Sequence, residues 1–149
     1  MIDVVLGALA ESVARFPCAV QVDMSGAPGW ESEITAALGT YSALSGAQFT
    51  AGTGGITFRV ADMNPIGSVI PLGTWSPSTA TITLVPADRL NHLRRLTVAS
   101  HELGHAFWLD HSTDPTSIMF PTATVHRLNA MDRAEIAANG CRDYTEAAA

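Results

Sequence analysis

Several features are scarce in this chain of 149 residues, and each shortage excludes a class of protein. Eight basic residues stand against fourteen acidic ones, and the net charge of −6 disfavours a nucleic-acid partner. The one adjacent basic pair, Arg94-Arg95, is predicted to lie on the solvated face of a helix. No apolar run is long enough to cross a membrane, and residues 1–3 lack the basic start of a secretory signal. We therefore expect neither a membrane span nor a nucleic-acid partner.

Cysteine is equally scarce, since Cys18 and Cys141 are the only two. They can form one disulfide joining the two ends of the fold, where the compartment and the geometry permit it. Hydrophobic residues make up 47% of the chain, which is enough for one domain with a sizeable core. Within it, residues 1–16 carry apolar side chains at helical spacing and are predicted to form an additional amphipathic helix.

Alternation and turn residues predict strands at 18–24, 49–50, 55–60 and 79–85, with a loop over 62–75. A first long helix is expected from Trp30 to the stop at Gly46. A second is expected from about Arg89 to Phe107 or Trp108, with Asp88 as its N-cap. Its buried side is predicted to consist of Leu90, Leu93, Leu96, Leu103 and Phe107. A third helix is expected through about Asn139, started by the capping pair Asn129 and Asp132.

The most informative stretch is SHELGHAFWLDHSTDPTSIMFP, residues 100–121. His101, Glu102 and His105 form an H-E-x-x-H pattern, and His111 follows six residues after the second histidine. On an α-helix, positions i and i+4 lie about 40° apart around the axis and roughly 6 Å along it, so both imidazoles can bind one ion. Glu102 lies about 100° round from His101 and can reach a water on that ion without being a ligand. Three neutral imidazoles leave a fourth tetrahedral position for water, as in catalytic zinc sites.

This pattern resembles the signature of the metzincin zinc peptidases, H-E-x-x-H-x-x-G-x-x-H followed by a methionine-containing turn. The His-Ser and Ser117-Ile118-Met119-Phe120-Pro121 runs look most like the branch of the matrix metalloproteinases. The resemblance implies that His101, His105 and His111 bind one catalytic Zn²⁺, that Glu102 is the general base, and that Met119 lies in the turn beneath the metal. It also implies an α+β, metzincin-like fold: a small, mostly parallel twisted sheet with an active-site helix, a backing helix and a C-terminal helix.

One position departs from the signature, because Trp108 stands where the family has glycine. That glycine lets the chain turn sharply after the helix, so that the third ligand folds back. If φ is positive at Trp108, the conformation should cost about 1–2 kcal/mol. Either the backbone turns differently here or the surrounding structure tolerates the strain, and Asp110 is the alternative third ligand if His111 is misplaced.

The resemblance also suggests where a substrate binds. The strand at 79–85 resembles the edge strand on which the family lays an extended peptide, which makes Thr81 a substrate-binding candidate. Trp75 either lines the cleft or covers part of the core. Pro121 and Thr122 follow the methionine turn and are expected to form one wall of the pocket for the side chain after the cleaved bond. The short loop at 62–75 has one carboxylate and no histidine, so structural calcium or a second zinc is not expected.

We therefore interpret residues 1–149 as one metzincin-like catalytic domain. Residues 1–16 form its extra helix, 18–108 an upper subdomain, and 109–149 a lower one. The expected function is that of a zinc endopeptidase acting through a metal-bound water and Glu102, on peptide or protein substrates, as a monomer. The resemblance implies a secreted or extracellular location. The alternatives are a peptidase for cell-wall peptides and a zinc-containing binding module without activity. Cys18 as a latency cysteine is a further alternative, but it lacks the flanking Arg and Gly.

Overall fold

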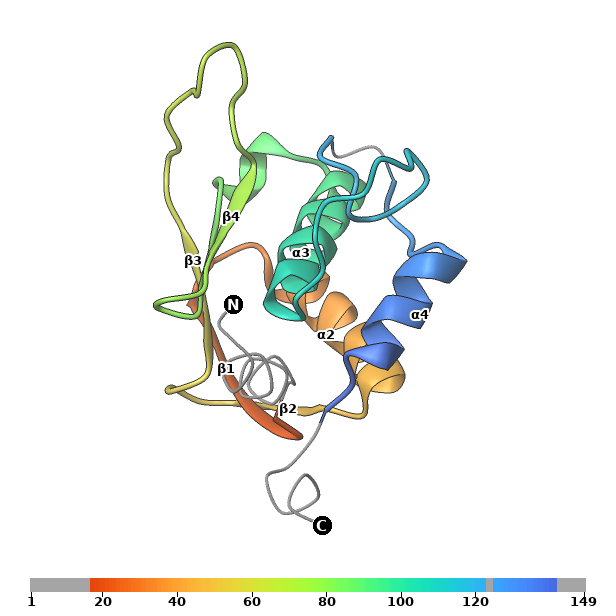
Figure 1. Cartoon of the computed structure of the whole chain (residues 1–149). Helices are drawn as coiled ribbons and strands as arrows, with labels where there is room; N and C mark the ends of the chain where they lie inside the picture. The colour runs from red at the N-terminus through yellow and green to blue at the C-terminus, as the bar shows by residue number, and fades with distance from the viewer. Residues whose placement is uncertain (1–16, 123–124, 142–149) are drawn as a thin grey trace.

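The computed structural model describes residues 17–122 and 125–141 (Figure 1). The helix predicted for residues 1–16 lies outside the described residues. Within the part that is described, no helix combines the length and the apolar character needed to cross a membrane. The architecture is a mixed sheet covered by helices, which confirms the predicted α+β, metzincin-like class.

Among the described residues, five strands form the sheet in the spatial order β2-β1-β3-β5-β4. The first four of these strands run parallel, and β4 pairs antiparallel to β5 at one end. In chain order the strands are β1 (Ala19–Gly26), β2 (Gln48–Ala51), β3 (Ile56–Val60), β4 (Gly73–Ser76) and β5 (Thr81–Leu84). Alternating apolar residues of β1 and β3 point into the core, among them Val20, Val22, Ile56 and Phe58.

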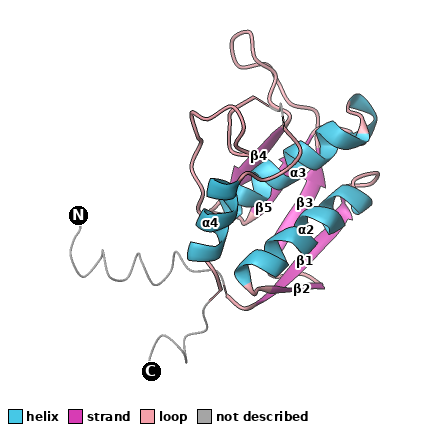
Figure 2. Ribbon diagram, turned by 90° about the vertical axis from the view of Figure 1, so that its right-hand side faces the viewer, coloured by secondary structure: helices cyan, strands magenta, loops and turns pink. Residues whose placement is uncertain are grey.

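Two helices of the described part, α2 (Glu31–Ser45) and α3 (His92–Ala106), cover one face of this sheet (Figure 2). A further helix, α4 (Ala130–Ala138), packs against α2 on the side away from the strands (Figure 1). The predicted apolar stripe of α2 is buried at Ile34, Ala37, Leu38 and Tyr41. Gly46 ends α2 with a φ of 82°, a left-handed conformation that glycine adopts without strain. The capping box of Asn129 and Asp132 starts α4 as predicted.

The predicted start of α3 is wrong. The chain first makes a short 3₁₀ turn, η1 (Ala87–Arg89), and α3 begins later with Asn91 as its N-cap, whose Oδ1 accepts the N–H of Arg94. Asp88 is therefore not the cap. Leu93, in the first turn of α3, is 49% exposed, so the predicted buried stripe does not extend to it.

The prediction of a solvated arginine pair is wrong for Arg95. Arg94 is exposed, but the Arg95 guanidinium lies 3.0 Å from the buried carboxylate of Glu33 on α2. It also donates to the backbone carbonyl of Ala87 at 3.0 Å and to that of Leu90. Glu33 is only 1% exposed and also accepts from His92 at 2.6 Å. Helical spacing alone does not reveal this partner, because it comes from another helix.

The edge of the sheet is also not where the sequence places it. The predicted edge strand, β5, lies between β3 and β4, and the outermost strand is β4, inside the segment predicted as loop. Its sequence, Gly-Thr-Trp-Ser, is short and carries a weak strand signal. Pairing with β5 from Gly73 to Ser76 creates the strand, and this pairing is a tertiary contact that local propensity does not encode.

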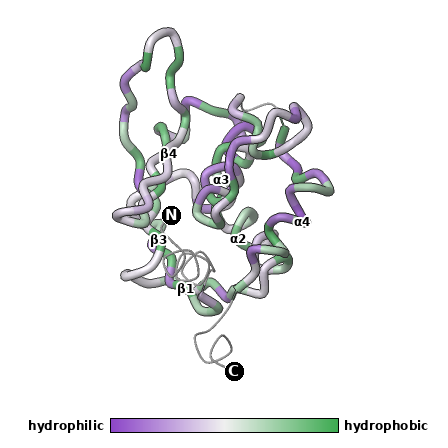
Figure 3. The backbone as a smooth tube through the Cα atoms, viewed as in Figure 1, coloured by the Kyte–Doolittle hydropathy of each residue, from purple (hydrophilic) through white to green (hydrophobic). Residues whose placement is uncertain are grey.

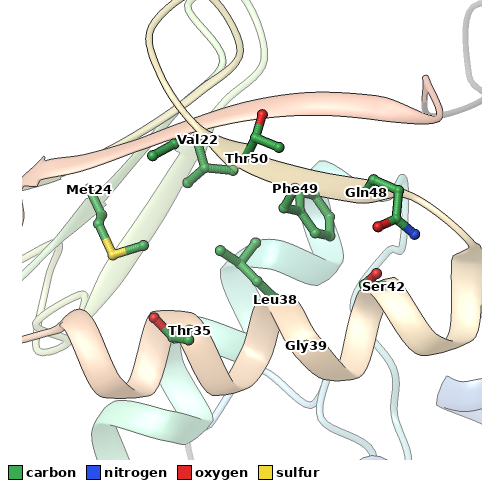
Figure 4. A pocket seen from close by; sticks show the side chains of 10 residues that line it. Val22, Met24, Thr35, Leu38, Gly39, Ser42, Gln48, Phe49 and Thr50 are labelled. Atoms are coloured by element: carbon green, nitrogen blue, oxygen red, sulfur yellow. The ribbon is translucent and has the colours of Figure 1, made fainter.

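Two further features complete the fold. Cys18 and Cys141 form a disulfide that joins the start of β1 to the chain beyond α4, so Cys18 is not a free latency cysteine. A cavity of about 330 Å³ opens between α2 and strands β1 and β2, lined by side chains such as Leu38 and Phe49 (Figure 4). It lies at the end of the sheet opposite β4, and no predicted site residue lines it.

Candidate metal centre

Helix α3 carries His101 and His105 one turn apart, and the backbone orients both rings. Nδ1 of His101 lies 2.7 Å from the carbonyl oxygen of Ile118, and Nδ1 of His105 lies 2.9 Å from that of Leu109. A carbonyl oxygen only accepts, so each Nδ1 carries the proton and donates. The Nε2 of each ring keeps a free lone pair, which is the tautomer that a metal ligand requires.

His111 brings the third imidazole to the same place. Its Nε2 lies 3.3 Å from Nε2 of His105, and one ligand atom from each of the three histidines lies within 4.8 Å of the others. In a tetrahedral zinc site with Zn–N bonds of 2.0–2.1 Å, two ligand nitrogens are about 3.3–3.4 Å apart. The donor set therefore fits Zn²⁺, and so does the spacing of His105 and His111. Among the described residues, Asp110 does not belong to this group of ligand atoms.

Trp108 determines how His111 returns to the helix. Its φ is 67°, the left-handed conformation that glycine has in the signature, so the backbone turns in the expected way despite the tryptophan. The N–H of Trp108 donates to the carbonyl of His105, and the N–H of Leu109 donates to that of Gly104, both at 3.0 Å. These two bonds form a Schellman motif, which caps the carbonyls at the end of α3. The fold thus tolerates the strain, and Trp108 remains 50% exposed.

The segment after His111 is held by a buried carboxylate on α4. Asp132 is 1% exposed and accepts from the Ser117 hydroxyl at 2.5 Å and from the Ile118 N–H at 2.8 Å. Because the Ile118 carbonyl in turn accepts from His101, the carboxylate positions the residue that orients this ring. Sequence reasoning assigned Asp132 only to a helix cap and missed this second role, for which the chain offers no local signal.

Met119 packs directly under α3. It is 1% exposed, and a Cβ added to Gly104 would come within 2.4 Å of its Sδ. Gly104 stands between the two helical histidines, so only a residue without a side chain lets this methionine approach. Sequence reasoning missed the importance of Gly104, although it lies inside the H-E-x-x-H pattern.

Glu102 lies beside the histidines, and only 6% of it is exposed. Burial raises the pKa of its carboxyl to about 7. The pKa of His101 is lowered to about 4, chiefly by burial. The hydrogen bond to Ile118 raises this pKa, and the charges of His105 and His111 lower it further. Near neutral pH in the metal-free protein, His101 is therefore neutral and able to bind a metal, while the carboxyl of Glu102 populates both its protonated and its charged form.

The edge strand β4 approaches this carboxylate. A Cβ added to Gly73 would lie 2.9 Å from Cγ and 3.3 Å from Oε2 of Glu102. Sequence reasoning did not identify Gly73, because its partner is 29 residues away along the chain. Glu102 thus lies against the helix-facing side of β4 at Gly73, on the outermost strand of the sheet.

The four predicted substrate residues come from two neighbouring strands and from the segment after Met119. Trp75 lies on β4, where it is partly buried and packs against the core. Thr81 lies on β5, where its backbone pairs with Thr57 of β3 and with Ser76 of β4, so it offers no free edge. Pro121 and Thr122 are exposed and follow the turn that contains Met119.

The sheet, the helix α3 and the three converging histidines define a domain of the metzincin type. A sequence profile of the matrixin peptidases matches residues 27–139, and the chain therefore belongs to the matrixin family.

Known proteins share parts of the chain or its fold. Macrophage metalloelastase of Oryctolagus cuniculus is 76% identical over 25 residues, and matrix metalloproteinase-20 of Homo sapiens is 56% identical over 32 residues. These matches cover 17% and 22% of this chain but only 5% and 7% of those proteins. The solved structure of a zinc-dependent peptidase from Methanocorpusculum labreanum (strain Z) has a TM-score of 0.54 at 12% identity, over 78% of this chain and 98% of that one. It shares the fold.

Proposed function

We propose that this chain is a zinc-dependent endopeptidase whose ion is held by His101, His105 and His111. The observation that carries the proposal is the convergence of three imidazoles, with one ligand atom of each within 4.8 Å of the others, beside the buried Glu102. Membership of the matrixin family supports the same assignment. The whole of residues 1–149 is proposed to be one catalytic domain, with its two parts meeting after Trp108.

When bound, zinc lowers the pKa of a coordinated water and polarises the carbonyl of the peptide. The other chemistry belongs to Glu102, which accepts the proton of the attacking water and then donates it to the departing amine. The carboxylate form of Glu102 takes the proton and its acid form returns it, so this one side chain can perform both steps. General acid–base catalysis of this kind contributes roughly 10²–10⁴-fold to the rate.

The substrate is proposed to bind as an extended polypeptide along the free edge of β4. The approach of Gly73 to Glu102 supports this position, since a peptide hydrogen-bonded to that edge would reach the carboxylate. An extracellular location is proposed as well. The disulfide between Cys18 and Cys141 supports it, because disulfides persist in oxidising compartments.

Two alternatives remain within the same site. Cleavage of cell-wall peptides differs only in substrate and needs a substrate test. A zinc-binding module without activity was suggested by Trp108. This residue keeps the turn that returns His111 to the site, so it no longer argues against a catalytic zinc site.

The test is to incubate the zinc-loaded protein with a complex peptide mixture and to identify new termini by mass spectrometry. The comparison variant is Glu102→Ala, and the matched control is Glu135→Ala, which removes an exposed carboxylate on α4. We expect cuts from the parent and from Glu135→Ala, but none from Glu102→Ala, although all three retain zinc.

If Glu102→Ala cuts at the parental rate, the proposed mechanism is wrong. A silent parent that retains one zinc, and whose His101→Ala variant loses both the zinc and thermal stability, would instead establish the binding module.

A further inference from the structure

The loop between β3 and β4 projects from the body of the molecule, at the top of Figure 1. Its base is held by the fold. Met63 and Leu72 pack against the core, and the carbonyl of Leu72 accepts the N–H of Val85 at 3.1 Å. Asp62 forms an ion pair with Arg89 at the same end of the loop. The loop therefore extends from a base that is anchored to the rest of the fold.

The outer part of this loop is ordered but apolar. Ile66 and Val69 exchange two backbone hydrogen bonds of 2.7 and 3.1 Å, and Gly67 between them has a φ of 64°. This tight turn leaves three aliphatic side chains in solvent, since Ile66 is 74%, Val69 64% and Ile70 54% exposed. We call these three residues the apolar tip. They are half of the six large hydrophobic side chains that are exposed among the described residues.

Such a grouping differs from the single exposed hydrophobic residues that any surface carries. Figure 3 shows green, hydrophobic stretches along the projecting loop. At the base of the same loop, Leu72 is partly buried against the core, so the fold buries some aliphatic residues of this loop but not those of the tip. Clustered exposed aliphatic side chains on an ordered turn are typical of an interaction surface.

The charge distribution limits what can bind there. Residues 63–87 contain no Asp, Glu, Lys, Arg or His, although the whole chain has a net charge of −6. This uncharged stretch includes both the apolar tip and β4. The side chains of β4 and of the tip therefore offer apolar and neutral polar contacts to a ligand that follows both, and no ion pairs of their own.

The distance along the chain between Gly73 and the apolar tip sets the length of a ligand that can contact both. Ile70 lies three residues before Gly73, and Ile66 lies seven residues before it. Gly73 itself lies against Glu102. At about 3.4 Å per residue, the tip lies within roughly 10–25 Å of Gly73. One extended polypeptide that presents a bond to Glu102 can thus reach the tip with about four to seven residues beyond that bond.

We propose that the apolar tip is an exosite that binds an apolar segment of a polypeptide substrate whose neighbouring segment lies along β4. This inference rests on the proposed peptidase function and adds a determinant of substrate choice outside the metal centre. It selects unfolded or extended proteins with aliphatic side chains several residues from the cleaved bond. A peptide too short to reach the tip gains nothing from it.

The test compares a long and a short substrate in three proteins. The variant Ile66→Ser/Val69→Ser/Ile70→Ser removes the tip, and Met131→Ser on α4 is the matched control, since Met131 is an exposed apolar residue elsewhere (65%). The long substrate is reduced, carboxymethylated α-lactalbumin, and the short one is a fluorogenic hexapeptide centred on a site that the parent cuts in it. We expect kcat/KM of the triple variant to fall about tenfold on the protein and less than about twofold on the hexapeptide.

Several outcomes would overturn the exosite. An equal loss on both substrates would mean that the substitutions disturb the metal centre, and no loss on the protein would mean that the tip does not bind it. Co-sedimentation of the parent, but not of the triple variant, with phosphatidylcholine vesicles, together with unchanged protein cleavage, would assign the tip to a membrane surface.

Binding separates the failure of this inference from the failure of the proposed function. With Glu102→Ala as background, we expect the triple substitution to weaken binding of carboxymethylated α-lactalbumin about tenfold. If the parent cuts nothing, the peptidase proposal fails, yet this measurement still decides the exosite. Equal binding by both proteins would refute it regardless of activity.

Discussion

Trp108 offers the sharpest test of the backbone geometry, because its φ of 67° is one that glycine adopts freely and other residues do not. Replacing Trp108 by glycine alone would mix two effects, since the half-buried ring also loses contacts. The informative comparison is between Trp108→Gly and Trp108→Ala, which both lack the ring. The left-handed conformation costs alanine about 1–2 kcal/mol, and the greater freedom of glycine in the unfolded chain offsets about 0.5–1 kcal/mol of that. We expect Trp108→Gly to be the more stable by about 0.5–1 kcal/mol.

The assay is urea unfolding of both variants, followed by circular dichroism in the absence of metal. The control is Ala36→Gly on the exposed side of α2, where helical geometry reverses the sign and glycine should cost about 1 kcal/mol. If Trp108→Ala is as stable as Trp108→Gly or more so, the chain does not make the left-handed turn. The position of His111 would then have to be derived anew, and Asp110 would return as the third ligand.

Three further predictions concern stability. Burial raises the pKa of Glu102 from 4.5 to about 7 in the metal-free protein. The buried carboxylate therefore lowers the unfolding free energy by up to about 3 kcal/mol once it is charged. That stability is fully present below pH 4.5 and is lost as the pH rises through 7. Glu102→Gln should therefore raise the urea unfolding free energy at pH 8 but not at pH 4. Glu33→Gln should lower it at pH 8, since burial raises the pKa of Glu33 but the hydrogen bonds from His92 and Arg95 outweigh it; the same sign for both variants would contradict this reasoning. The disulfide closes a loop with a sequence separation of 123, so Cys18→Ser/Cys141→Ser should lower the unfolding free energy by about 2–5 kcal/mol, and an unchanged value under oxidising conditions would show that the bond is not formed.

Much of the metal centre could be predicted because its first part is local. His101 and His105 share a helix face through their spacing alone, and helix geometry brings their rings together whatever surrounds them. The position of the third histidine depends on one backbone angle, the φ of Trp108. The sequence left both His111 and Asp110 open as the third ligand, and the positive φ in the structure favours His111. Local patterns also predicted the ends of α2 and the capping box of α4.

The wrong start of α3 is a local error, caused by the short turn η1, whereas the other errors come from contacts between segments distant in the chain. β4 forms only because β5 lies beside it, so the edge strand was misplaced. Arg95 was predicted to be solvated because its partner, Glu33, belongs to another helix. The pairing of Gly73 with Glu102 and the second role of Asp132 are contacts of the same kind.

The sequence by itself determines the fold class, the family and the identity of the residues that can hold a metal, because these depend on spacing and on residue chemistry. Only the tertiary structure decides which strand borders the site, which carboxylate is buried enough to have a pKa of about 7, and which side chains remain exposed on the loop before β4. Those properties arise from packing and desolvation, and both exist only once distant segments have come together.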